Sequence, residues 1–317
     1  MLTPLISDPK RRWPHARARA YLTTDRLAAK TGGTVPIIGQ KKPNGRRRKI
    51  TEYWYKYRDD LYKRVEVRDA TEHVYHDETG NEDKLATNIR RAARMIEGYA
   101  LCNEWDYFGT FTLNPAIRNR ADLDKFRADI MQLLRHLRRG PCSDAGGCGG
   151  PQQDGQESRR DVAALLVPEL HRDKKGWHMH GLLRGLPRDE LRPFTLSEKL
   201  PKYIRGQLRK GESIYDWPHY RERFGFVDIE PVRDRDAAAR YITKYVTKGI
   251  DATAANIEVG KHLYYVTRGL RQPERMECES APGCVPDALP TNLISGNSYP
   301  IELNGQEIGT VTWYQRP

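Results

Sequence analysis

Two histidines separated by one residue form the first pattern in this sequence that could carry chemistry. His178 and His180 lie in HMHGLLR, residues 178–184, whose composition predicts a β-strand. Residues two apart on a strand point to the same face, so both imidazoles project together while Met179 turns towards the core. Glu169 lies upstream, where a hairpin would bring it opposite the histidines. Two imidazoles and a carboxylate form a ligand set that suits a divalent metal ion and leaves positions open for substrate oxygens.

The third ligand has two candidates, and the whole set has a structural alternative. His171 lies two residues after Glu169, so it shares that strand face and competes for the position. Histidines are common metal ligands, but a His-x-His pair also arises by chance on a strand that only packs. The residues by themselves leave both a metal site and a packing role open.

Two tyrosines and two lysines at helical spacing form the second pattern, in YITKYVTK, residues 241–248. With about 3.6 residues per turn, Tyr241 and Tyr245 fall on one face of a helix, and Lys244 and Lys248 fall on an adjacent face. Phenols and ammonium groups on one helix suit a substrate that carries phosphate. For this helix alone, tyrosines that pack against a sheet are the alternative interpretation.

The two patterns together indicate transfer of a DNA phosphate onto tyrosine. A phenol has an ordinary pKa of about 10 and is a poor nucleophile at neutral pH unless it is activated. A divalent metal ion polarises a phosphodiester and positions the attacking group, and lysines offset the charge that builds in the transition state. The expected cofactor is Mg²⁺ or Mn²⁺.

Hydrophobic periodicity predicts the elements that must position these residues. Residues 186–220 follow no pattern that we can assign, and the Gly- and Cys-rich residues 140–160 form a polar insertion. The expected fold class is α+β, with a central, mainly antiparallel β-sheet and packed helices. Strands are expected at 107–113, 163–170, 178–184, 224–232 and 261–269, helices at 82–101, 121–139 and 234–249, and a hairpin at 299–315 around Asn304-Gly305.

Positive charge is concentrated at the start of the chain. The 317 residues carry a net charge of +12, and residues 1–50 hold 13 Lys and Arg against two Asp and Glu. Such an arm indicates a polyanionic partner, although a solvated tail uses the same charges. We expect residues 1–60 to form a flexible basic arm. Its candidate DNA-binding residues are Lys41, Lys42, Arg46, Arg47, Arg48 and Lys49.

Cysteine spacing and hydropathy limit the remaining classes of protein. Cys142 and Cys148, like Cys278 and Cys284, are separated by five residues, which leaves either a zinc site or plain loop cysteines open. No apolar stretch reaches the length of a membrane span, and no secretion signal or P-loop is present. We expect a protein of the bacterial cytoplasm with no membrane partner.

The order of three motifs resembles the HUH endonucleases, the rolling-circle replication initiators of small phages and plasmids. These motifs are FTLN at 111–114, HMH at 178–180 and YITKYVTK at 241–248. The resemblance covers about residues 85–270, and it extends to LLVPELHRDKKGWHMHGLLRG and FGFVDIEPVRD. It implies an HUH, RRM-like fold for an endonuclease domain over 61–275, followed by a tail with a β-hairpin over 276–317.

The resemblance also implies roles for individual residues. His178 and His180 match the metal-binding histidines, with Glu169 as the favoured third ligand. Tyr241 and Tyr245 match the paired nucleophiles of the two-tyrosine initiators, and Lys244 and Lys248 match the motif lysines. The implied reaction nicks single-stranded origin DNA, leaving a 5′-phosphotyrosine and a free 3′-hydroxyl. With no helicase motif in the chain, a host helicase and DNA polymerase are the expected partners.

Two other functions compete with this prediction. A two-tyrosine transposase or a conjugative relaxase uses the same chemistry, but relaxases usually place the tyrosine before the histidines, the reverse of the order here. A non-catalytic DNA-binding protein, such as a repressor of its own origin, would keep the basic arm and need neither histidines nor tyrosines.

Overall fold

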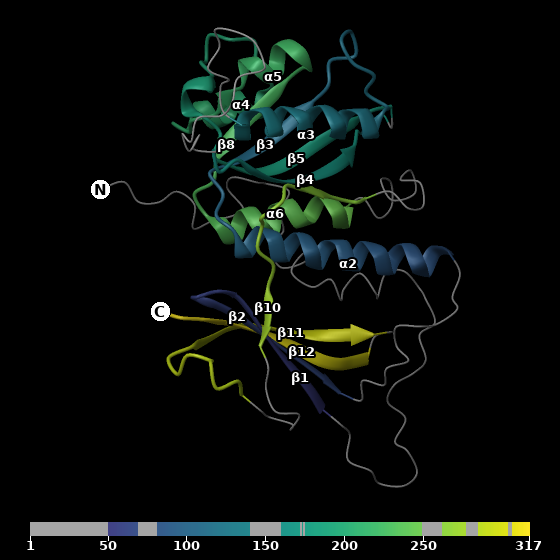
Figure 1. Cartoon of the computed structure of the whole chain (residues 1–317), viewed down its shortest axis with the longest axis vertical. Coiled ribbons are helices and arrows are strands. Elements are labelled where there is room, and N and C mark those ends of the chain that lie inside the picture. The colour runs from purple at the N-terminus through teal and green to yellow at the C-terminus, as the bar shows by residue number, and fades with distance from the viewer. Residues whose placement is uncertain are drawn as a thin grey trace, which may run out of the picture. The chain divides into compact units, whose positions relative to one another are not determined.

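The chain folds into two compact units, which are best followed by colour in Figure 1. The computed structural model describes residues 50–68, 81–139, 160–171, 173, 175–248, 262–276, 285–303 and 306–317. One unit combines residues 1–103 with 271–317, and the other consists of residues 104–270. Both chemical patterns fall within the second unit.

The described strands of the first unit form a five-stranded antiparallel sheet in the order β10-β1-β2-β12-β11. Helix α2 contacts β1, and the Lys63 ammonium lies 3.1 Å from a Glu97 carboxylate oxygen of that helix. β11 and β12 form the hairpin that the sequence predicts. The elements are β1 (Ile50–Arg58), β2 (Leu61–Arg68), α2 (Asn81–Cys102), β10 (Glu274–Met276), β11 (Ile294–Leu303) and β12 (Gln306–Gln315).

The second unit contains a seven-stranded antiparallel sheet in the order β6-β7-β8-β3-β5-β4-β9. The α+β class and the antiparallel sheet are therefore as predicted. The strands are β3 (Tyr107–Thr112), β4 (Ala163–Leu170), β5 (Trp177–Arg184), β6 (Arg192–Pro193), β7 (Tyr215–Asp216), β8 (Val227–Pro231) and β9 (Tyr265–Val266). The helices are α3 (Leu123–Arg139), η3 (Arg188–Glu190), α4 (Lys202–Leu208), α5 (Pro218–Arg223) and α6 (Arg235–Lys248).

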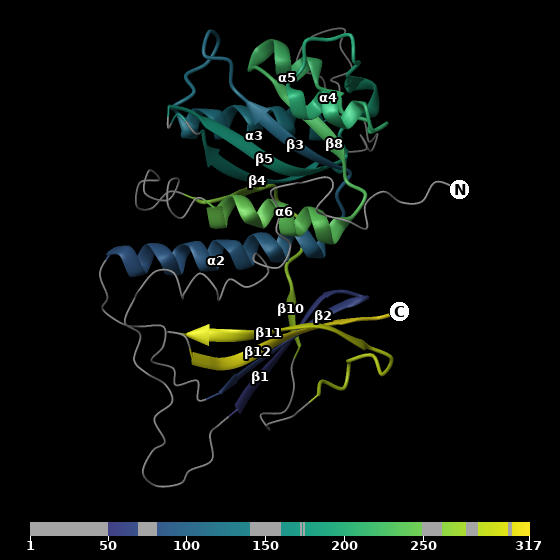
Figure 2. The same ribbon diagram turned by 180° about the vertical axis from the view of Figure 1, so that it is seen from behind.

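The central strands separate a hydrophobic face from a polar one, because successive side chains point to opposite sides of a sheet. Phe111 and Met179 point towards α3 and join Phe126 of that helix in the main core. His180 points to the opposite face, where it stacks against Tyr245 of α6. Figure 2 shows α3 and α6 on opposite sides of this sheet.

Side-chain caps begin the two helices that cover the sheet. Asp122 accepts a hydrogen bond from the Lys125 amide at 2.9 Å at the start of α3. Asp234 accepts one from the Ala237 amide at 2.9 Å at the start of α6. These caps satisfy amides that have no partner within the helix. The helices begin at Leu123 and Arg235, within two residues of the expected starts at 121 and 234.

The division of the chain differs from the domains that the sequence suggests. Residues expected at the end of a 1–60 arm form β1, which pairs with both β2 and β10. β2 also pairs with β12, so the start of the expected 61–275 domain and the 276–317 tail belong to one sheet. The expected domains differ from the observed units because strands from distant parts of the chain pair with one another. Residues 1–49 of the arm, and the 140–160 insertion up to 159, lie outside the described residues.

One predicted strand is shorter than expected, and the residues left unassigned contain several short elements. The strand expected at 261–269 is reduced to Tyr265–Val266, and Gly269 follows it with a positive φ of 91°. The unassigned residues 186–220 contain η3, β6, α4, β7 and part of α5, each too short to give a periodic pattern.

Gly225 lies just before β8, where the backbone passes close to the end of β3. Its φ is +144°, and a Cβ atom there would lie 2.4 Å from the Asn114 amide nitrogen. We expect Gly225→Ala to lower the free energy of unfolding by about 2 kcal/mol or more, because strain and a backbone clash add. Urea denaturation measures this. Gly206→Ala in α4, where no atom lies within 4 Å, is the control and should gain about 0.5–1 kcal/mol; equal effects would contradict the account.

Candidate active site

Polar side chains of the neighbouring strands β8, β3, β5 and β4 lie together on the face of the sheet that α6 covers. On β3, Thr112 pairs in register with His178 of β5, and Thr110 pairs with His180. On the far side of β5, Glu169 of β4 pairs with His178. The sheet thus places the predicted metal ligands side by side, although Glu169 belongs to β4 and the two histidines belong to β5.

Each histidine is held by a threonine of the neighbouring strand. The Thr112 hydroxyl lies 2.9 Å from His178 Nδ1, and the Thr110 hydroxyl lies 3.4 Å from His180 Nδ1. A hydrogen bond to one ring nitrogen fixes the tautomer and orientation of the other, as in most protein metal sites. In both rings this leaves Nε2 as the nitrogen available to a ligand.

Glu169 contacts His180 directly. Its Oε2 lies 2.9 Å from His180 Nε2, a distance that requires one proton shared between the two groups. Among the described residues, no group of three or more His, Cys, Asp or Glu is arranged to hold a metal ion as it stands. The donors nevertheless fit a divalent ion in kind, since an ion would take the place of that shared proton between nitrogen and carboxylate.

The protonation state of His178 also suits a metal ligand. Burial, followed by the neighbouring charges of His180 and His171, lowers the pKa of His178 to about 4. The ring is therefore neutral at neutral pH, the form in which imidazole binds metal.

His171 also reaches the histidine pair, but in a different way. Its ring centroid lies 4.8 Å from that of His178, and its Nδ1 lies 3.0 Å from Asp173 Oδ1. Glu169 shares a hydrogen bond with a histidine of the pair, whereas His171 packs beside one. The geometry thus favours Glu169 as the third ligand over His171.

The two tyrosines of α6 lie against this histidine face. The Tyr245 ring stacks on His180 with centroids 3.6 Å apart and planes 14° apart. The Tyr245 hydroxyl donates to the Tyr241 hydroxyl oxygen at 2.7 Å. Phe108 of β3 lies under the pair, 5.1 Å from the Tyr241 ring and 6.5 Å from the Tyr245 ring. The two sequence patterns therefore meet at one place.

Burial keeps both phenols neutral. It raises the pKa of Tyr241 to about 12, although the hydrogen bond from Tyr245 acts in the opposite direction. Burial also raises the pKa of Tyr245 well above its usual value, and there the bond to Tyr241 adds to the effect. Neither phenol ionises unaided near neutral pH, so a nucleophilic role requires activation by a neighbouring group.

The motif lysines divide between described and undescribed parts of the chain. Lys244 is buried at 2% exposure, and its ammonium lies 5.3 Å from the centre of the Tyr241 ring. A buried cation beside a phenol stabilises negative charge on its oxygen. The side chain of Lys248 lies outside the described residues, as do the six basic candidates of the arm and Cys142, Cys148, Cys278 and Cys284. The remaining cysteine, Cys102, is free and buried.

Asp228 of β8 is a buried member of this face that sequence analysis missed. It is 1% exposed, accepts a hydrogen bond from the Tyr203 hydroxyl at 2.7 Å, and is also bonded by Thr110. Burial, together with the charge of the buried Glu230, raises the pKa of Asp228 to about 7. The available signal was the polar pair Asp228 and Glu230 within FGFVDIEPV, two residues apart and so on one face.

A continuous line of polar contacts results. Tyr203 bonds Asp228, Asp228 bonds Thr110, and Thr110 reaches His180. His180 in turn contacts Glu169. These contacts join residues of α4, β8, β3, β5 and β4.

No protein-family model matches the chain, and no curated protein or solved structure matches it either. Among the described residues, no helix is both long and apolar enough to cross a membrane.

The pKa of Asp228 predicts a pH dependence of stability. An acid whose pKa rises on folding stabilises the native state below its unfolded pKa, and this contribution is lost as pH rises through the folded value. For Asp228 this window runs from about pH 4 to about pH 7. We expect Asp228→Asn to gain stability relative to the parent across it, by at most about 4 kcal/mol.

Urea denaturation of both proteins at pH 4, 6 and 8 checks this prediction. Asp189→Asn removes a carboxylate at the exposed end of the same unit and serves as the control. A stability difference between parent and Asp228→Asn that stays constant with pH would contradict the prediction.

Proposed function

We propose that the chain is a metal-dependent, tyrosine-based endonuclease of the HUH type that nicks single-stranded DNA and initiates rolling-circle replication. One observation carries the proposal: the Tyr245 ring stacks on His180 while its hydroxyl bonds Tyr241. Candidate nucleophiles and candidate metal ligands are thus in direct contact. The antiparallel sheet with helices on both faces supports the HUH, RRM-like fold that the motifs imply.

The bond changes follow from the residues present. A tyrosine oxygen attacks a backbone phosphorus, an O–P bond forms, and the bond from phosphorus to the 3′ oxygen breaks. The phenol loses its proton and the 3′ oxygen gains one, which leaves a 5′-phosphotyrosine and a free 3′-hydroxyl that primes a polymerase. A divalent ion held by His178, His180 and Glu169 would supply charge stabilisation at the phosphate.

The hydrogen bond between the phenols distinguishes their roles. Because Tyr245 donates to Tyr241, it stabilises a phenolate at Tyr241 and disfavours one at itself. The Lys244 ammonium, beside the Tyr241 ring, acts in the same direction. We therefore assign the first attack to Tyr241 and the second to Tyr245.

Packing alone would explain the same contacts in a DNA-binding protein without catalysis, so the test must detect a covalent product. Full-length protein is incubated with the single strand of its own replicon and Mn²⁺ or Mg²⁺, and adducts are resolved on a denaturing gel. We expect a metal-dependent adduct that is lost in His178→Ala and in the Tyr241→Phe/Tyr245→Phe double variant.

Single variants then test the order of attack. Tyr241→Phe should lose most of the adduct, whereas Tyr245→Phe should retain it. The exposed His136→Ala on α3, and Tyr215→Phe on the hydrophobic face, are matched controls that should nick as the parent does. Binding of DNA with no adduct under either metal would sink the endonuclease proposal, and leave a non-catalytic DNA-binding protein.

The threonines give a test of the metal site that does not depend on activity. Thr112→Val keeps the shape of the side chain but removes the hydroxyl that holds His178 Nδ1. We expect Mn²⁺ affinity, measured by isothermal titration calorimetry, to fall about 10- to 100-fold, as for other residues that orient metal ligands. Thr291→Val, at an exposed position of the other unit, should bind Mn²⁺ as the parent does. Equal affinities for Thr112→Val and the parent would contradict this role.

A further inference from the structure

Residues 192–216, between β5 and β8 in the chain, form a small lobe beside the candidate active site. The lobe contains β6, α4 and β7, and it has a hydrophobic cluster of its own. That cluster is formed by Phe194, Ile204 and Ile214, with Leu200, Leu208 and Phe226 packed around it. A separate core gives the lobe a fixed shape.

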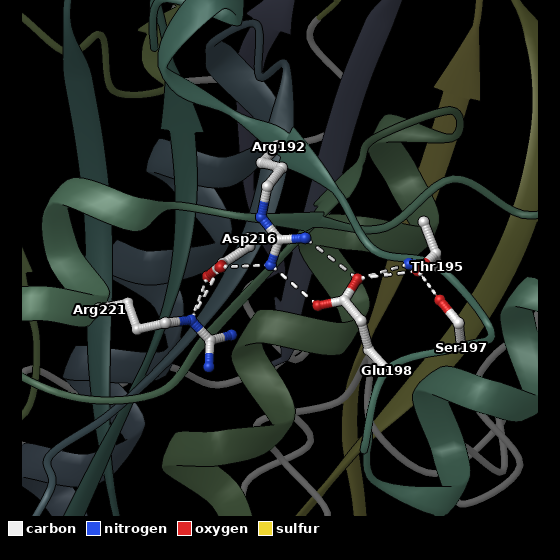
Figure 3. A network of polar contacts seen from close by, with 6 residues as sticks. All are labelled: Arg192, Thr195, Ser197, Glu198, Asp216 and Arg221. Carbon is white, nitrogen blue, oxygen red and sulfur yellow. Dashed lines mark hydrogen bonds and ion pairs between the residues drawn. The ribbon is translucent and has the colours of Figure 1, made fainter.

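A polar network joins the strands of the lobe to each other and to α5 (Figure 3). Arg192 donates to both carboxylate oxygens of Glu198, at 3.1 and 2.9 Å, and to Asp216 at 3.0 Å. Arg221 of α5 donates from Nε to both oxygens of Asp216, at 2.7 and 2.8 Å. Asp216 is 1% exposed, so its buried charge is offset by two arginines. The carboxylates of the lobe that this network uses are thereby neutralised.

Tyr203 of α4 is anchored at one end and exposed at the other. Its hydroxyl donates to the buried Asp228 at 2.7 Å, while the residue as a whole is 51% exposed. Asp228 lies on the same sheet face as His180 and is joined to it through Thr110. A half-exposed aromatic ring is therefore held at the edge of the candidate active site.

The lobe that carries this ring also exposes positive charge. The lobe also exposes Leu196, at 50%. The exposed basic residues of the same stretch are Lys199, Lys202, Arg205, Arg209 and Lys210. Proteins that bind single-stranded nucleic acid combine exposed cations with exposed aromatic rings, since cations follow the phosphates and aromatic rings stack on the unpaired bases. A duplex keeps its bases stacked on each other and could use only the charges.

We propose that the α4 lobe binds the DNA single strand next to the nick, with one nucleobase stacked on Tyr203. This inference rests on the proposed function, because it names the element that holds the substrate of that site. The hydrogen bond to Asp228 positions the ring before DNA arrives, which reduces the entropy lost on binding. The charges of α4 then hold the backbone of the same strand.

The test measures binding without cleavage. Full-length protein carrying Tyr241→Phe and Tyr245→Phe is titrated, with no metal, against a fluorescent single-stranded oligonucleotide and against a duplex of the same sequence. Adding Tyr203→Leu should weaken single-strand binding about 5- to 150-fold and leave duplex binding unchanged. Tyr203→Phe keeps the ring and should bind more tightly than Tyr203→Leu.

Two further measurements separate stacking from a loss of structure or charge. A 2-aminopurine base in the oligonucleotide should change fluorescence on binding to the parent and Tyr203→Phe, but not to Tyr203→Leu. Lys202→Gln/Arg205→Gln should weaken single-strand binding and reduce its salt dependence. The charge-matched Arg135→Gln/Arg139→Gln on α3 should not, because α3 packs on the hydrophobic face of the sheet, opposite to Asp228, the partner of Tyr203.

Equal single-strand affinities for Tyr203→Leu and the parent overturn the inference, as does an equal loss of duplex binding. Competition by poly-glutamate as effective as that by the oligonucleotide also overturns it and indicates an acidic protein partner. Because this assay needs neither metal nor tyrosine attack, its result is independent of nicking. If Tyr203→Leu loses single-strand binding but the parent forms no adduct, the role of the lobe is supported and the endonuclease proposal is rejected. If the parent nicks DNA but Tyr203→Leu binds the single strand as the parent does, the endonuclease proposal is supported and the role of the lobe is rejected.

Discussion

The register between β3 and β5 determines what the rest of the second unit can do. It places Thr112 opposite His178 and Thr110 opposite His180, so each imidazole has a hydroxyl on the neighbouring strand. A slip of one residue would turn the histidines into the hydrophobic core, because side chains alternate between the two faces of a sheet. Met179, which is fully buried on the α3 face, resists such a slip. Apolar packing on one side of the sheet therefore fixes the chemistry on the other.

The buried polar groups on the α6 face of the sheet are hydrogen-bonded one to the next. An unpaired buried polar group is costly, and a low dielectric strengthens each bond that is made. Asp228 receives two hydroxyl donors, and the His180 ring has a partner at each nitrogen. Tyr245 covers that ring, so α6 closes the face without introducing an unpaired phenol. The same contacts that stabilise the layer also hold its reactive groups in place.

Much of this arrangement could be predicted from the sequence where the signal is local. The run of apolar residues at 163–170 predicted β4 with its observed bounds, and alternation predicted that His178 and His180 share a face with Met179 turned away. Glu169 was expected opposite the histidines from a hairpin and lies there.

The parts that were missed depend on contacts between distant residues. Thr110 of β3 pairs with Asp228 of β8, and nothing in the sequence of either strand predicts that these two residues meet. Tyr203 lies in a lobe whose apolar residues meet only after the chain folds back, so no period was visible. The first sheet was divided between an arm, a domain and a tail because β2 pairs with β12 from the opposite end of the chain.

That pairing of chain ends has a consequence for how the protein is made. Three of the five strands in the first sheet come from residues 271–317, and β1 and β2 alone would be a two-stranded hairpin, which is marginal in water. Asn103 and Arg271, which flank the second unit, are joined by two hydrogen bonds of 2.9 Å. During synthesis from the N-terminus, residues 104–270 have all been made before the first sheet can close. The first sheet therefore cannot be complete until residues 271–317 have been made, whereas the second unit, with the histidines and tyrosines, needs only residues 104–270.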